Sequence, residues 1–281
     1  MAAGRVQQLR GASRGDRDER SERAGPERDT PAHLRASDPE AALAELRRVQ
    51  VASAPISLAT ERTLPVGEAF SGLLGDGLRR GTAVDTGGRA ATSLALALVA
   101  GASAAGSWVA VVGIGSLGLA AVAELGVHPE RLALVDAPEP GRWGSVLTAL
   151  TEAFDVVVAG PTPHLRRQQA DRLTARLRER GSSLVRVGWP ARGWPGRPEL
   201  SVRGVDVTWT GLGEGHGHLQ ARRVTVEVTG RRGADRPRRA ELWLPDGDGR
   251  VRPLDAAERS DRSIDTGRGT RPALVPLEHA G

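Results

Sequence analysis

The feature that most constrains this chain is the alternation of short apolar runs with stretches of helical periodicity, which fills the region from Leu64 to Trp189. Such alternation is typical of strands joined by crossover helices. We therefore expect an α/β fold with a mostly parallel, twisted sheet and helices on both faces. The expected strands are 82–85, 108–112, 132–135, 155–159 and 183–187, and the expected helices are 92–103, 117–125, 142–153 and 165–180.

The pattern changes after Trp189 and is different again at both ends of the chain. Segments 202–209, 222–228 and 240–244 alternate as hairpin strands do, so we expect antiparallel strands at the C-terminal edge of the sheet. Both termini are polar and are expected to be disordered. The predicted organisation is a disordered arm (1–36), an N-terminal helix and linker (37–67), a core (68–245) and a flexible tail (246–281).

All 39 cationic side chains are arginine, because the sequence contains no lysine, and the formal net charge is +5. The resulting pI of about 11.1 favours anionic partners such as nucleic acid. The sequence contains no cysteine, which excludes disulfides and thiolate metal sites, and we expect no metal and no cofactor. No apolar run is long enough to cross a membrane, so a cytoplasmic location without membrane contact is expected.

A glycine-rich segment after the first core strand resembles a phosphate-binding loop. In such a loop, backbone amides and the N-terminus of the next helix face the phosphates, and a Gly-Lys pair followed by a hydroxyl residue completes the site. Here Ala90 and Ala91 replace the Gly-Lys pair. A tight connection from strand to helix is the favoured interpretation, ahead of residual phosphate binding or a partner contact. The residues of this degenerate phosphate loop are Gly87, Gly88, Arg89, Thr92 and Ser93.

The segment 73–81, together with the order of the strands that follow it, resembles the entry to the core of the RecA family. The degenerate loop and the arginine-rich ends are most similar to the ImuA-type accessory proteins of the actinobacterial mutasome. In this resemblance the positions of the ATPase lysine, the catalytic acid and the metal-binding aspartate fall on Ala91, near Gly115 and on Gly160. Glycine and alanine supply neither charge nor oxygen, so we expect a non-enzyme.

The resemblance implies a non-catalytic RecA-like scaffold that supports DNA-damage-induced translesion synthesis and mutagenesis. The implied partners are an ImuB-type polymerase homologue, RecA and single-stranded DNA. An SOS-type cell-division regulator is an alternative, because such regulators share a degenerate core of this kind.

A second glycine motif supports a different class of function. Gly113, Gly115 and Gly118 follow a strand and precede a helix, and Asp136 ends the next strand. This spacing matches the dinucleotide-binding fingerprint, in which the glycines admit a pyrophosphate and the acid binds a ribose. An NAD(P)-binding oxidoreductase is therefore a second hypothesis. The chain offers it no obvious catalyst, since tyrosine and lysine are both absent.

Two further segments are candidates for contacts with DNA or a partner. The helix expected at 165–180 has an apolar face and many arginines elsewhere, which suits phosphate backbones as well as a solvated surface. The loop after the last parallel strand carries indoles and guanidiniums, which could stack on bases or cover a sheet edge. The candidate residues are Arg166, Arg167, Arg172, Arg176, Trp189, Arg192, Trp194 and Arg197.

Overall fold

The computed structural model describes residues 6–7, 63–75, 77–161, 165–188, 198–212, 217–230 and 236–260. The helix expected within 37–67 lies outside these ranges. The arm expected to be disordered contains one described element, the short strand β1 (Val6–Gln7), which pairs antiparallel with the edge of the main sheet.

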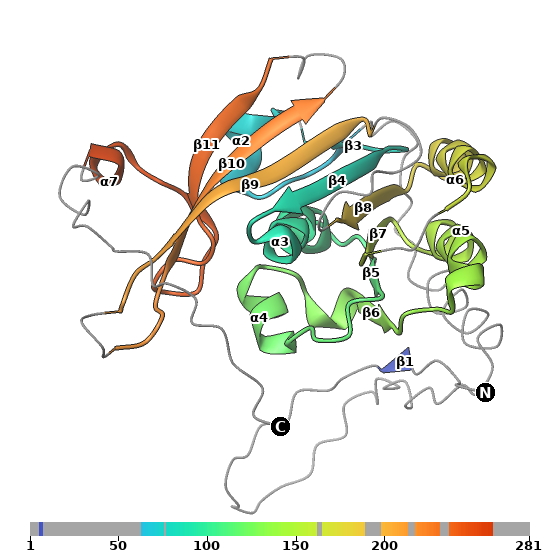
Figure 1. The fold of residues 1–281 in the computed structure, drawn as a ribbon, viewed down its shortest axis with the longest axis horizontal. Helices are drawn as coiled ribbons and strands as arrows, with labels where there is room; N and C mark the ends of the chain where they lie inside the picture. The colour runs from blue at the N-terminus through green and yellow to red at the C-terminus, as the bar shows by residue number, and fades with distance from the viewer. Residues whose placement is uncertain are drawn as a thin grey trace, which may run out of the picture.

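The main sheet has the strand order β1-β6-β5-β7-β8-β4-β9-β10-β11-β12, and its β6-to-β9 part is parallel throughout. The apolar, β-branched sequences of these strands suit a sheet that is covered on both faces. Figure 1 shows the sheet with helices on either side of its parallel strands. The parallel strands present before β9 are β4 (Ala83–Gly88), β5 (Val109–Val112), β6 (Leu132–Val135), β7 (Val156–Ala159) and β8 (Ser183–Val187).

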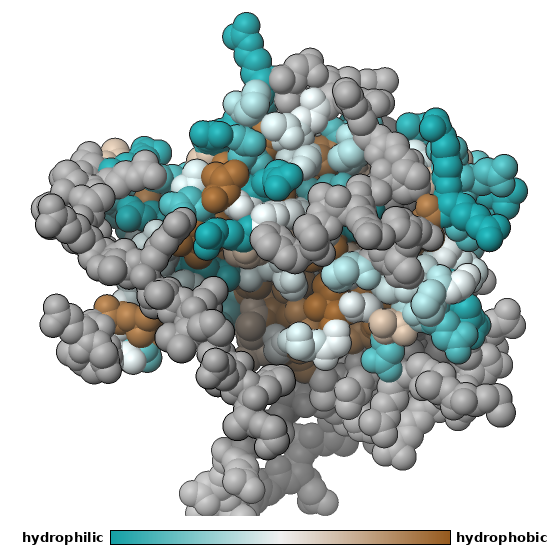
Figure 2. All heavy atoms as spheres, in the orientation of Figure 1, coloured by the Kyte–Doolittle hydropathy of each residue, from teal (hydrophilic) through white to brown (hydrophobic). Residues whose placement is uncertain are grey.

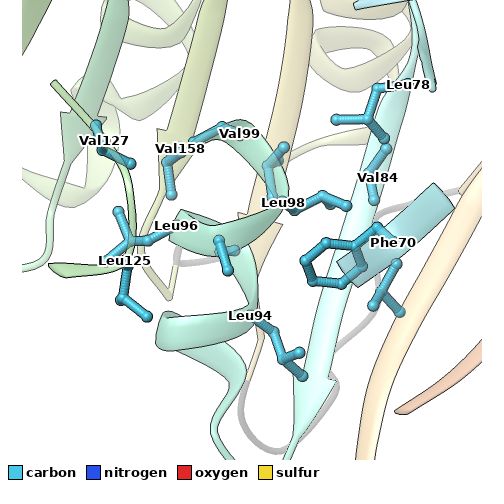
Figure 3. Packing of buried hydrophobic residues seen from close by; sticks show 14 of the residues in the cluster. Phe70, Leu78, Val84, Leu94, Leu96, Leu98, Val99, Leu125, Val127 and Val158 are labelled. Carbon is cyan, nitrogen blue, oxygen red and sulfur yellow. The ribbon is translucent and has the colours of Figure 1, made fainter. Parts of the chain in front are cut away.

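Two apolar cores lie on opposite faces of the sheet and fix which helix covers which face. One core contains α2 (Glu68–Leu74), α3 (Ala91–Ala104) and α4 (Leu119–Glu124), and the other contains α5 (Trp143–Ala153) and α6 (Arg167–Arg180). Helix α3 is buried over most of its surface. Figure 3 shows Leu98 of α3 directed toward Val84 and Phe70, while Leu96 lies toward Leu125.

Smaller elements close the edges of this arrangement. Strands β2 (Thr63–Leu64) and β3 (Leu78–Arg79) form a separate two-stranded sheet, and the segment between β2 and α2 crosses α3 at Gly101. A Cβ at Gly101 would lie 2.5 Å from the carbonyl carbon of Val66, so this crossing needs glycine. Short 3₁₀ turns precede β6 and α5, at Pro129–Arg131 and Pro140–Arg142.

The C-terminal half of the sheet is a meander of β9 (Leu200–Trp209), β10 (Arg222–Gly230), β11 (Arg238–Trp243) and β12 (Arg252–Pro253). The antiparallel prediction is correct from β9 to β12. Strand β9 itself runs parallel to β4, so the change of direction falls between β9 and β10. The hairpin of β9 and β10 extends beyond the end of β4, toward the lower left of Figure 1.

The folded part of the chain extends beyond residue 245, where the sequence predicts a flexible tail. Asp246 is buried, and its carboxylate accepts hydrogen bonds from the amides of Asp248 and Arg250 and from Arg252. Arg252 also pairs with Glu258 of α7 (Ala256–Ser260) at 2.7 Å. Arginine and carboxylate side chains thus fix a segment whose polar composition resembles that of a linker.

These pairs shift the titration of the C-terminal segment. The hydrogen bond from Arg252 is the main reason that the pKa of Glu258 falls to about 2. Burial alone would raise the pKa of Asp246, but hydrogen bonds from Arg250, Arg252 and Asp248 hold it below its usual range. Both carboxylates are therefore charged in the folded chain at neutral pH, and the charge contributes to its stability.

Candidate functional site

The degenerate phosphate loop is shorter than the sequence suggests. Strand β4 extends to Gly88 instead of ending at residue 85, and α3 begins at Ala91. Only Arg89 and Ala90 connect them. Gly87 and Gly88, which are expected in a turn, pair in register with Arg203 and Gly204 of β9. The prediction of a turn at these two glycines is wrong, because a neighbouring strand continues alongside them.

Close packing of two backbones explains the glycines at this position. A Cβ on Gly88 would collide with the carbonyl oxygen of Gly204, and a Cβ on Gly204 would collide with the carbonyl oxygen of Arg89. The amide of Arg89 donates a 2.8 Å hydrogen bond to the Gly204 carbonyl. This amide, which a phosphate loop would direct at its ligand, is therefore used within the sheet.

The start of α3 also departs from a phosphate cradle. Ala90 precedes the helix with φ at 58°, a left-handed conformation that is uncommon for a residue with a Cβ, and no side chain caps the helix. Arg89 is exposed, and Thr92 and Ser93 in the first turn are half-buried. The five predicted loop residues are contiguous in space, but only their hydroxyl groups resemble the set that holds Mg²⁺ in a working site.

A largely buried ion pair lies next to this loop, and no sequence motif predicts it. Arg186 of β8 is opposite Asp85 of β4, and its Nε and Nη2 donate to the two carboxylate oxygens at 3.1 and 2.9 Å. The Arg186 side chain is 9% exposed. The geometry is bidentate, so the carboxylate already occupies two of the donors of this guanidinium.

The glycines of the dinucleotide fingerprint do not adopt the strand-turn-helix geometry that their spacing predicts. Helix α4 begins at Leu119, after all three glycines, and has only six residues. A pyrophosphate site needs the helix to begin within the motif, so that its first amides face the ligand. Gly115 is exposed with open space around its Cα, and Asp136 is exposed at the end of β6.

Side-chain and backbone packing fills the space over the first glycine of this motif. Gly113 has φ at 72°, and a Cβ there would collide with the indole of Trp143, the buried first residue of α5. Gly160, after β7, packs its Cα against the carbonyl oxygen of Gly113. The helices that follow β5 and β7 cover opposite faces, so this is a topological switch point, where α/β proteins often bind ligands. Here Trp143 and the two glycines close it.

The arginines predicted on the helix at 165–180 are placed on the outer surface of α6. Ala170, Leu173 and Leu177 face the core, whereas Arg166, Arg167, Arg172 and Arg176 are all exposed. Arg176 pairs with Glu179 at 2.9 Å and lies 4.0 Å from Glu152 of α5, and Arg167 lies 3.8 Å from Asp171.

The other predicted contacts lie outside the described residues. Trp189, Arg192, Trp194 and Arg197 all belong to the segment between β8 and β9 that the structure does not describe. In the parts of the chain that it does describe, no three histidine or carboxylate side chains come together as a metal site. The described helices include none that is both long and apolar enough to span a membrane.

Sequence reasoning missed the apolar surface of the β9–β10 hairpin. The large exposed hydrophobic side chains of the described residues are all here: Val205, Trp209, Leu212 and Leu219, the last two 62% and 49% exposed. Figure 2 shows hydrophobic surface at the tip of the hairpin. The guanidinium of Arg222 lies 5.1 Å from the Trp209 ring, and its burial there lowers the pKa of Arg222. A β-bulge at Val205 directs this side chain to solvent.

Comparisons with known proteins agree with the fold. The model of a family described as the MT3502 N-terminal domain matches residues 72–196, which contain both glycine motifs. The uncharacterized protein Rv3395c of Mycobacterium tuberculosis is 34% identical over 120 residues, which cover 42% of this chain. The aligned region spans 58% of that relative's length.

A solved structure shows the same architecture. The RadB recombinase superposes with a TM-score of 0.50 at 16% identity, covering 69% of this chain and 100% of the RadB chain. The chain has a RecA-like fold. At this level of identity the likeness establishes the fold, and the function has to be argued from the residues of the site.

Proposed function

We propose that this protein is a non-catalytic RecA-like scaffold that supports DNA-damage-induced translesion synthesis. The observation that carries the proposal is the pairing of β4 with β9 through Gly88, which uses the backbone that would otherwise bind phosphate. A chain without lysine has no ammonium group to neutralise a terminal phosphate from any other position.

The positions of the catalytic acids support the same proposal. In the RecA resemblance, the water-activating and metal-binding carboxylates fall near Gly115 and on Gly160. Gly160 is packed against Gly113, and a Cβ at Gly160 would collide with the Gly113 carbonyl oxygen. A longer side chain at Gly160 would need the loop to move, so the local packing is adapted to glycine.

The role in translesion synthesis rests on the resemblance to ImuA-type accessory proteins and on surfaces suited to partners. The projecting β9–β10 hairpin exposes Trp209, Leu212 and Leu219. Exposed aromatic and aliphatic groups that cluster on one element are typical of protein contacts. We propose this hairpin as the surface that contacts an ImuB-type polymerase homologue.

Co-purification with that polymerase homologue after DNA damage tests the proposal. We expect the two proteins to associate, and we expect Trp209→Ser/Leu212→Ser/Leu219→Ser to abolish the association without a loss of fold. The control variant Arg142→Gln/Arg236→Gln changes exposed residues outside the hairpin and should associate normally. A deletion strain with unchanged damage-induced mutagenesis and no association would refute the role.

Two alternatives are separated by simple observations. A cell-division regulator with the same core would cause filamentous growth on overexpression in the absence of DNA damage. An NAD(P)-binding oxidoreductase would bind a nicotinamide dinucleotide saturably and lose that binding on Gly115→Val. The late start of α4 and the position of Trp143 over Gly113 weigh against the second alternative.

A further inference from the structure

The outer face of α6 carries more positive charge than its acidic neighbours can balance. Six exposed arginines lie on or directly before this helix, and a seventh, Arg79, is exposed at the end of β3. The acids that pair with them are Asp171, Glu179 and Glu152. Figure 2 shows hydrophilic side chains gathered over α6. The arginines of this surface are Arg79, Arg166, Arg167, Arg172, Arg176, Arg178 and Arg180.

Five of these arginines, Arg172 and Arg178 among them, make no ion pair with any described residue. Arg172 lies in the middle of α6, and Arg178 lies in its last turn. Arg79 joins them at the C-terminal end, because the turn that follows it packs against α6. A Cβ on Gly81 of that turn would lie 3.0 Å from the Cα of Arg178. Positive charge therefore continues from one end of the helix to the other and onto β3.

The chemistry of this face distinguishes it from a protein contact. Interfaces between proteins usually have an apolar centre, but the exposed large hydrophobic residues of the described chain all lie on the β9–β10 hairpin. Apart from Asp171 and Glu179, the outer face of α6 consists of arginine with glutamine, threonine and alanine. Guanidinium groups donate paired hydrogen bonds to phosphate oxygens, which suits them to a phosphate backbone.

We propose that the outer face of α6, continued by Arg79, binds the phosphate backbone of double-stranded DNA without reading its sequence. The 14 residues of α6 span about 21 Å, long enough to follow several phosphates of one strand. No aromatic side chain lies on α6, so it offers no platform for the stacking on which single-stranded binding depends. The proposal adds a DNA contact to the proposed scaffold function and rests on it only for its biological meaning.

The test uses the purified full-length chain, a fluorescent 25-base-pair duplex and a titration of salt. The variant Arg172→Gln/Arg178→Gln removes two unpaired charges and should weaken binding about tenfold. It should also reduce the slope of log affinity against log salt by about 2. The matched control Arg203→Gln/Arg236→Gln removes the same charge from exposed positions without ion pairs in the described structure, and should stay within about twofold of wild type.

Three results would overturn the proposal. Equal losses in both double variants would show a general effect of net charge. If the chain binds an oligothymidine strand more tightly than the duplex, and Arg172→Gln/Arg178→Gln does not change that affinity, nucleic acid binds at another surface. If the chain binds polyglutamate but not the duplex, and the binding requires Arg172 and Arg178, the partner is an acidic protein. Normal DNA binding without polymerase association would instead refute the scaffold role alone.

Discussion

Both glycine-rich segments at the carboxyl edge of the sheet are closely packed, but by different parts of the chain. At the end of β4, the glycines lie within the strand, and the neighbouring backbone of β9 occupies the space beside them. After β5, the first glycine turns the chain under the indole of Trp143. In both places glycine permits a close approach, and the group that approaches is protein.

The difference between the turns shows what a glycine motif can and cannot indicate. A missing Cβ allows a phosphate, a carbonyl group or an indole to come near, and the sequence of the turn alone does not distinguish them. The partner of each turn lies far away in sequence, on β9 for one and on α5 for the other. Substitutions at the contacts can therefore test each assignment separately.

The largest effect is expected where two backbones meet. Gly204→Val places a branched side chain against the carbonyl oxygen of Arg89. We expect a loss of about 4 kcal/mol in the free energy of unfolding, measured by urea denaturation. The control Gly87→Ala meets only the Gly188 carbonyl oxygen at 3.6 Å and should change stability by less than about 0.5 kcal/mol. An unchanged stability of Gly204→Val would mean that the Arg89 backbone does not pack against Gly204.

The second turn should be sensitive at Gly113 and tolerant at Gly115. Gly113→Ala adds a Cβ against Trp143 at a positive φ, and we expect a loss of about 2–3 kcal/mol. Gly115→Ala enters open space and should be nearly neutral. Thermal unfolding of the two variants measures the contrast. Equal tolerance at both positions would show that the indole does not close the turn.

The C-terminal segment around Glu258 lies outside both turns and contributes a stability that depends on pH. The pKa of Glu258 is about 2, below its ordinary 4.5, so its charge stabilises the fold above about pH 4.5. This contribution is lost as the pH falls from about 4.5 to 2. Glu258→Gln should flatten the fall in stability over that range, whereas Gly113→Ala should shift the whole curve. Urea unfolding midpoints measured from pH 2 to 7 test this. If Glu258→Gln lost stability between pH 4.5 and 2 as steeply as the wild type, the prediction would be contradicted.

The smallest effect is expected at the residue that starts α3. Ala90 holds a left-handed conformation that glycine adopts more easily. Ala90→Gly should therefore stabilise the chain by about 0.5–1 kcal/mol, less than the full strain because glycine is more flexible when unfolded. Denaturation curves of this variant and of Ala91→Gly, which lies in the helix and should destabilise, provide the comparison. A destabilised Ala90→Gly would mean that the strain is absent.

The fold could be predicted from sequence because periodicity reports burial on each element. The strand at 132–135 has the predicted limits, and the helices of the parallel part end within a few residues of theirs. Helix α2 and the folded segment after Leu244 were missed. The first is short, and the second is held by Asp246, Arg252 and Glu258, whose side chains are typical of a linker.

The candidate site could be predicted only in part. The absence of lysine is visible in the sequence and needs no structure. The pairing of Gly88 with Gly204 and the ion pair of Asp85 with Arg186 join residues about a hundred positions apart, and no local pattern reports such contacts. The exposed hairpin side chains were missed because alternation in a strand gives its period but not which part of it extends beyond the sheet.

Titration of the pure protein with ATP and Mg²⁺, followed by calorimetry and by phosphate release, tests the central claim most directly. We expect no saturable binding up to millimolar nucleotide and no phosphate release above that of the buffer alone. Saturable, Mg²⁺-dependent ATP binding with measurable hydrolysis, lost on Thr92→Val, would contradict the account.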